Sequence, residues 1–151
     1  MREILFRGRL KAENGELKKG DWVYGDLVTL IDGKEKHLHI YGKGEVKAET
    51  IRQFTGLTDK NGTKIFDGDV VKAVIVRDLG GGTENRQETG IIAYDKIGMI
   101  GLFAKYAGSI PIWSDFFQEL TLSGCINDFW FEIICNINDN PELLESEVQG
   151  E

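Results

Sequence analysis

The sequence predicts a mostly β protein, a small barrel or roll with one or two short helices. Apolar and polar residues alternate in several short segments, which is the period of a half-buried strand. Glycine is abundant (19 of 151 residues) while proline is rare (2 residues), as expected for short strands joined by tight turns. The apolar fraction of 41% and charged fraction of 28% are typical of a folded globular chain of one domain or two small ones.

The first predicted strand runs from Ile4 to Leu10. Its period of two places Ile4, Phe6 and Leu10 on one face and Arg7 on the other. A turn is expected after it, at the Asn-Gly pair of positions 14 and 15.

The second predicted strand, Trp22 to Ile31, is rich in aromatic and β-branched residues. Asp32 and Gly33 follow it directly, and an Asp-Gly pair between apolar runs is the strongest short signal of a hairpin. Lys36 to Tyr41 is then the returning strand.

The middle of the chain carries the densest turn signals. We expect one or two helical turns in Ala48–Phe54, a loop over Thr55–Gly62 and a short strand at Lys64–Phe66. A turn at Gly68 leads into the β-branched run Val70–Arg77, which is typical of a well-buried strand.

The second half contains further strands and a glycine-rich loop. Three glycines at 80–82 begin a polar stretch, predicted to be flexible, that ends at Glu88. Strands are expected at Thr89–Tyr94 and Ile100–Tyr106, with a turn at Gly98 between them.

Phe129 to Ile137 shows the clearest alternation of the chain. Its large apolar residues and Cys135 fall on one face, so the thiol is interpreted as a small core group. The sequence Asn-Pro-Glu from Asn140 predicts the start of a short helix, with asparagine at the N-cap and proline at the first helical position.

Charge is unevenly distributed along the chain. All 18 Lys and Arg residues lie between Arg2 and Lys105, together with 16 acids, which gives that segment a net charge of +2. Tyr106 to Glu151 holds 9 acids and no base. Such asymmetry indicates an interaction surface or, more simply, an acidic end that aids solubility. No basic cluster has the form that nucleic-acid binders usually show.

No catalytic set is apparent, and we expect neither enzyme activity nor a cofactor. His37 and His39 share a strand face and could offer two metal ligands, but a polar exposed face is the simpler interpretation and no metal site is predicted. The glycines at 80–82 lack the Gly-Lys-Ser/Thr of a phosphate loop. Asp67 and Asp69 flank a glycine, which is typical of a turn rather than an acid–base pair.

The expected compartment is the cytoplasm, and no membrane partner is expected. The start of the chain lacks the apolar stretch of a signal peptide, and no apolar run reaches the roughly 20 residues needed to span a bilayer. Cys125 and Cys135 are then reduced thiols, too few for a structural zinc site.

Three segments together resemble the YopX family of phage and prophage proteins. They are Gly20–Leu27, Thr50–Val71 and Asn136–Leu144, and the opening Arg2–Gly8 fits the same pattern. The middle segment is the most specific, with Gln-Phe-Thr-Gly-Leu-Thr-Asp-Lys-Asn-Gly from Gln53 and Gly-Asp-Val-Val from Gly68.

The resemblance implies an SH3-like β-roll in the C-terminal part, homo-oligomeric assembly and the cytoplasm of a bacterial host. It implies no activity, because the family has no established function. We expect an N-terminal β subdomain over residues 1–58 and the roll with its acidic tail over 59–151, or one intertwined unit. Gln53, Thr55 and Asp59 are the candidate binding residues, since turn geometry explains them least.

The leading hypothesis is therefore a non-enzymatic, oligomeric interaction protein. The alternative is a nucleic-acid-associated β-barrel module, which the net charge of −7 disfavours. It would gain support if Arg7, Arg9, Lys11, Lys18 and Lys19 gathered on one face.

Overall fold

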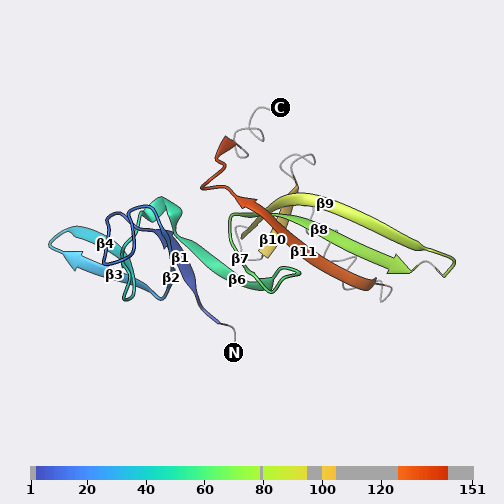
Figure 1. Ribbon diagram of the computed structural model, residues 1–151, viewed down its shortest axis with the longest axis horizontal. Helices are drawn as coiled ribbons and strands as arrows, with labels where there is room; N and C mark the ends of the chain where they lie inside the picture. Colours follow the sequence, from blue (N-terminus) through green and yellow to red (C-terminus); the bar gives the residue numbers. More distant parts are fainter. Residues whose placement is uncertain (1–2, 79, 95–99, 105–125, 143–151) are drawn as a thin grey trace. The chain divides into compact units, whose positions relative to one another are not determined.

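The computed structural model describes residues 3–78, 80–94, 100–104 and 126–142. The protein is mostly β, as predicted, and its residues form two compact units, Met1–Gly56 and Leu57–Glu151 (Figure 1). Within the described residues, none of the helices is long and apolar enough to cross a membrane. The division into separate domains at residues 58 and 59 stays a prediction.

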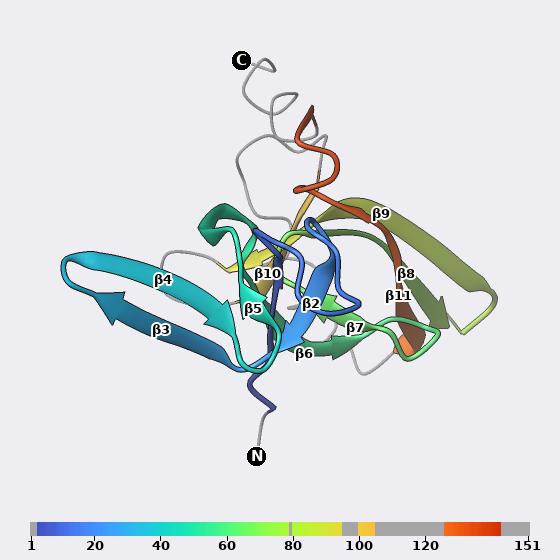
Figure 2. The same cartoon turned by 60° about the vertical axis from the view of Figure 1, so that its left-hand side comes forward.

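The strands of the N-terminal unit belong to two sheets. Strands β1 and β2 belong to a four-stranded sheet of order β2-β1-β6-β7, and the other sheet has the order β3-β4-β5 (Figure 2). A single turn of 3-10 helix, η1, lies between β5 and β6. The bounds are β1 Phe6–Arg9, β2 Trp22–Gly25, β3 Leu27–Asp32, β4 Glu35–Ile40, β5 Gly44–Glu45, η1 Ala48–Thr50 and β6 Arg52–Thr58.

A small apolar core holds this unit together. Leu10, Val23, Ile40 and Val46 are buried there, with half-buried apolar side chains packed around them. Strand β1 approaches Val46 so closely that a Cβ on Gly8 would lie 2.9 Å from the valine Cβ. Glycine is therefore required at that position for the two segments to pack.

The predicted strand Trp22–Ile31 is in fact two strands, because the chain leaves one sheet and enters the other at Gly25 and Asp26. Gly25 has a φ of +154°, and a Cβ there would lie 3.0 Å from the Ile40 side chain. The turn at Asp32 is confirmed, since Asp32 pairs with Glu35 across a two-residue connection.

The expected helical structure in Ala48–Phe54 is the single turn η1. Two other expectations for this part of the chain were wrong, since Thr55–Thr58 belongs to strand β6 rather than to a loop and Arg7 is only 7% exposed instead of facing solvent. Its guanidinium carbon lies 4.7 Å from the centre of the Trp22 ring, and stacking of this kind allows a cation to be buried.

The C-terminal unit is built on a curled antiparallel sheet of order β10-β9-β8-β11 (Figure 1). Val70, Ile91 and Ile137 form one buried cluster in it, and Cys135 packs against them. The bounds are β7 Lys64–Phe66, β8 Asp69–Asp78, β9 Thr83–Tyr94, β10 Ile100–Ala104 and β11 Ile126–Asn136.

The polar stretch before residue 89, predicted to be flexible, is part of β9. Residues 83–88 pair with 73–78 of β8 in an unbroken register, so ladder hydrogen bonds extend β9 beyond its apolar half. The expected turn at Gly98, the strand beyond Ala104 and the body of the helix after Glu142 lie outside the described residues.

On the predicted apolar face of Phe129–Ile137, Phe131 and Ile137 are buried, whereas Ile134, on the other predicted face, is exposed. The register with β8 shifts between Ile133 and Cys135. Cys135 is half-buried, and this burial raises the pKa of its thiol. The thiol therefore stays protonated at neutral pH, consistent with its interpretation as a packing group.

Candidate functional site

The hairpin of β3 and β4, residues Leu27–Ile40, extends away from the rest of the N-terminal unit and is called the arm below (Figure 2). Large apolar side chains on and beside it face solvent. Leu30 is 50% exposed, Ile31 69% and Tyr41, directly after β4, 74%. We take this grouping of exposed apolar side chains on one hairpin as the candidate for a surface that another molecule covers.

Leu30 and Ile31 point to opposite faces of the arm, because side chains alternate along a strand. One face borders a surface depression of about 450 Å³. Most of the lining atoms are apolar, and His39 is one of the residues at its wall. The lining residues are Asn14, Val28, Leu30, His39, Ile40, Tyr41, Gly42, Lys43 and Gly44.

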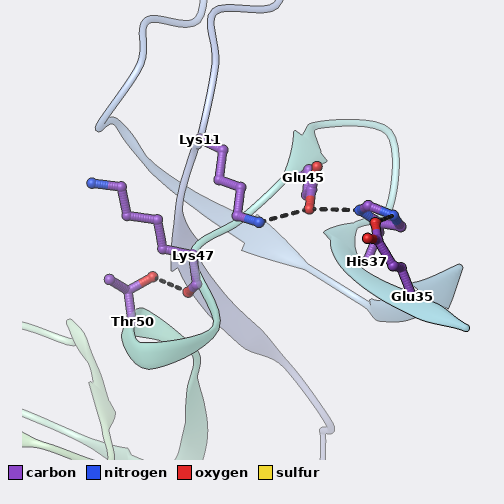
Figure 3. Close-up of polar contacts among 6 residues, drawn as sticks. All are labelled: Lys11, Glu35, His37, Glu45, Lys47 and Thr50. Carbon is purple, nitrogen blue, oxygen red and sulfur yellow. Dashed lines mark hydrogen bonds and ion pairs between the residues drawn. The ribbon is translucent and has the colours of Figure 1, made fainter.

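His37 of β4 belongs to a charged cluster with Lys11, Glu35 and Glu45 (Figure 3). Glu45 Oε1 accepts a hydrogen bond from Lys11 Nζ at 2.8 Å and lies 3.0 Å from His37 Nδ1. The Lys11 hydrogen bond first, and His37 second, lower the pKa of Glu45. Glu35 Oε2 is 3.7 Å from His37 Nε2. His37 is thus held by carboxylates, while His39 lies over the depression.

Among the described residues, no cluster of three or more His, Cys, Asp or Glu side chains is arranged to hold a metal ion. The two histidines that shared a face in the sequence have different surroundings, one ionic and one apolar.

The short strand β5 has its outer edge covered. Lys11 N donates to Glu45 O and Lys47 N donates to Arg9 O, each at 2.9 Å. Thr50 fastens the same segment (Figure 3), since its hydroxyl donates to Lys47 O at 2.7 Å and accepts from Arg9 N at 2.9 Å. The three-stranded sheet is therefore closed on the β5 side.

The opposite edge of that sheet is β3. In the part of the chain that the structure describes, β4 is the only strand that pairs with β3. Exposed edges in natural proteins are usually protected by lysine, proline, a bulge or very short length. The six residues Leu27–Asp32 contain neither lysine nor proline, and their register with β4 is unbroken. This edge lacks each of those protections.

Two of the five basic residues that would favour nucleic acid stack on an aromatic ring of the fold. Arg7 and Arg9 stack on Trp22, with Arg9 4.5 Å from the ring centre, and Arg9 Nη1 donates to Gly20 O. Lys11 binds Glu45. Lys18 and Lys19 are exposed, as is Lys11 beside Glu45, so it is the charge of the two arginines that contacts other groups within the fold.

The three predicted binding residues lie in different surroundings. Gln53 is half-buried in β6 opposite Phe6, and Thr55 is buried. Asp59 belongs to the C-terminal unit, where its Oδ1 accepts from the backbone N–H groups of Asn61 and Thr63. Asp59 therefore closes a turn. A binding role for the three stays a prediction.

Two other sequence candidates have structural roles. Asp69 is buried, and its Oδ2 accepts from Phe66 N at 2.8 Å across the turn at Gly68. Gly80 to Gly82 lie in the connection between β8 and β9, where Asp78 pairs with Thr83.

Sequence reasoning missed the residues of the open edge, above all Thr29, Leu30 and Ile31. A signal was present, since Leu27–Ile31 carries no charge and lies just before a tight turn. Strand order decides which strand forms an edge, and alternation along one strand does not contain that information.

Comparison with known proteins gives a match at the level of a protein family. Neither the curated proteins nor the solved structures contain a chain similar enough to match. The sequence pattern of the YopX protein family matches residues 16–145, which is most of the chain. The chain therefore belongs to the YopX protein family.

Proposed function

We propose that the protein is a non-enzymatic interaction protein that works as a homo-oligomer. The family resemblance supports a phage or prophage origin and action in the cytoplasm of a bacterial host. It also supports an SH3-like roll for the C-terminal unit, whose curled antiparallel sheet is compatible with that topology.

The exposed apolar arm is the observation that carries this proposal. Fully burying a leucine or isoleucine side chain stabilises by about 1.5–3 kcal/mol relative to leaving it in water. Leu30, Ile31 and Tyr41 each leave at least half of their surface exposed. An association that covers them gains this hydrophobic contribution, and a monomer in water does not.

The charge layout supports association of like chains as well. Residues 1–105 carry a net charge of +2 and residues 106–151 a net charge of −9. Opposite charges on two copies attract, and salt screens that attraction over a Debye length of about 8 Å at physiological ionic strength. We therefore expect raised salt to weaken the assembly.

The experiment is light scattering on a size-exclusion column, with absorbance recorded at the protein and nucleic-acid wavelengths. We expect a discrete oligomer free of nucleic acid. Ile31→Lys should reduce its mass because a charge would be buried at the contact. The matched control is Ile134→Lys, at an isoleucine 55% exposed in the C-terminal unit, which should leave the mass unchanged.

A monomeric wild-type chain would refute the proposal. A peak carrying nucleic acid would instead favour the nucleic-acid-associated module. Equal effects of the two lysine substitutions would show that the arm is not the contact.

A further inference from the structure

We propose that β3 pairs antiparallel with β3 of a second copy of the chain, about a two-fold axis that passes through Thr29. The sheet β3-β4-β5 would then continue into its copy as one larger sheet. This inference rests on the proposed homo-oligomer and specifies the surface and register of its contact.

The backbone groups that point outward from β3 follow from its pairing with β4. Hydrogen-bonded and non-hydrogen-bonded pairs alternate along an antiparallel ladder. Tyr41 N donates to Asp26 O at 2.9 Å directly before β3. Counting by twos, Val28 and Leu30 direct their backbone groups toward β4, whereas Leu27, Thr29 and Ile31 direct theirs away from it.

A two-fold axis perpendicular to the sheet fixes which residues can face each other. Such an axis keeps each face of the sheet on the same side, so a residue pairs with one an even number of positions away. Centring on Thr29 places Thr29 opposite its own copy and Leu27 opposite Ile31 of the second copy. These are the residues whose N–H and C=O groups point outward.

The side chains are self-complementary in this register. Val28 faces Leu30 of the second copy on the side of the depression, and Leu27 faces Ile31 on the other side. Apolar and Thr–Thr pairs opposite each other stabilise antiparallel sheets. Centring on Leu30 instead would place Val28 opposite Asp32, which loses an apolar pair on each side of the axis.

Like charges meet at the two ends of this pairing. Asp32 is the only charged residue of β3, and in the register centred on Thr29 it lies beyond the outermost apolar pair, opposite Asp26 of the second copy. Opposed acids disfavour an antiparallel pair, so the apolar and Thr–Thr pairs between them supply the association. The lack of lysine, proline and bulges, unfavourable for an edge in water, is suitable for an edge that is paired.

The first test is Thr29→Pro in the full chain. Proline removes an N–H that points away from β4, a position where edge strands tolerate it, so the hairpin should persist. We expect the assembly to dissociate at this contact, so that the particle mass falls about twofold if the contact joins a dimer. Thr29→Val, which keeps the N–H and suits a strand, is the control and should keep the mass.

Cross-linking tests the register itself. In a hydrogen-bonded antiparallel pair the Cα atoms are about 5.5 Å apart, within the range of a disulfide. Thr29→Cys should therefore give a linked 29–29 peptide on oxidation, identified by mass spectrometry with Cys125 and Cys135 left in place. Ile31→Cys should not, because its two copies would be roughly 13 Å apart.

The outcomes separate this inference from the proposal on which it rests. An oligomer whose Thr29→Cys variant forms no 29–29 link, or whose mass survives Thr29→Pro, would overturn the edge pairing and leave the oligomer standing. A wild-type chain that is monomeric at all concentrations would overturn both. Unchanged thermal unfolding of Thr29→Pro would show that lost mass reflects lost contact rather than lost fold.

Discussion

Two outer strands differ in how they are protected from solvent: β3 in the N-terminal unit and β11 in the C-terminal unit. Strand β11 is interrupted by a register shift beside the exposed Ile134. The turn of residues 59–62 also covers part of it, since Lys60 N donates to Phe131 O at 2.8 Å. Glu132 of β11 binds Lys60 and Lys72 through its carboxylate.

Strand β3 has none of these features. Its register with β4 is continuous, its residues are mainly apolar, and no described segment donates to its outer side. Bulges and charges are the usual means of preventing edge-to-edge association. Among the described residues, the chain therefore protects the β11 edge and leaves the β3 edge open, which is why we assign association to the arm.

The largest expected effects come from the separate cores of the two units. Leu10→Ala should lower the free energy of unfolding by about 2–5 kcal/mol, because it opens a cavity among fully buried neighbours. Ile92→Ala should do the same in the C-terminal unit. Hydrogen exchange read separately for each unit measures both changes.

If the units unfold independently, Leu10→Ala should accelerate exchange in the N-terminal unit alone. Equal acceleration in both units would mean that they fold as one cooperative domain, against the predicted division near residue 58. Leu10→Ile, which conserves volume, is the matched control and should cost less than about 1.5 kcal/mol.

A smaller effect is expected at the turn after β6. Asp59→Ala removes the acceptor for two backbone N–H groups, at 2.9 Å from Asn61 and 2.8 Å from Thr63. The stability of the C-terminal unit should fall by about 1 kcal/mol, measured by denaturant unfolding. Asp59→Asn keeps an acceptor oxygen and should recover most of the loss. A normal stability for Asp59→Ala would contradict the turn-closing role and leave Asp59 as a candidate binding residue alone.

The smallest expected effect is the pH dependence at the base of the arm. The folded state lowers the pKa of Glu45 through Lys11 and His37, so the unfolded state binds its proton more readily. The resulting stabilisation is present above the ordinary carboxyl pKa of about 4 and is lost as the pH falls through the lowered value.

Melting temperatures of the wild type and Glu45→Gln, recorded from neutral to acid pH, measure this contribution. The wild type should melt higher at neutral pH, and the difference should shrink on acidification. Glu49→Gln, an exposed acid of η1 outside the Lys11–Glu45–His37 cluster, is the comparison variant. A difference that grows in acid would contradict the assigned direction of the pKa shift.

Periodicity predicted the apolar strands well. The β-branched run from Val70 and the hairpin at Asp32 are where the sequence places them, because burial and turn chemistry are both local signals there. The polar half of β9 was mistaken for a flexible stretch, since its extension depends on pairing with β8 rather than on its own residues.

Burial of charge was harder to predict. The sequence predicts that Arg7 faces solvent, but its side chain is buried in contact with Trp22, fifteen positions later. The candidate site was missed for a similar reason. Alternation marks β3 as a strand, whereas only the order β3-β4-β5 makes it an edge.

The most direct measurement of the central claim is residue-resolved hydrogen exchange of the arm as a function of protein concentration. The amides of Val28 and Leu30 are protected by β4 in either case and serve as an internal reference. We predict that the amides of Leu27, Thr29 and Ile31 exchange quickly in dilute protein and become protected as the assembly forms. Rapid exchange of these amides in the fully assembled protein would contradict the claim that β3 is the edge through which two copies meet.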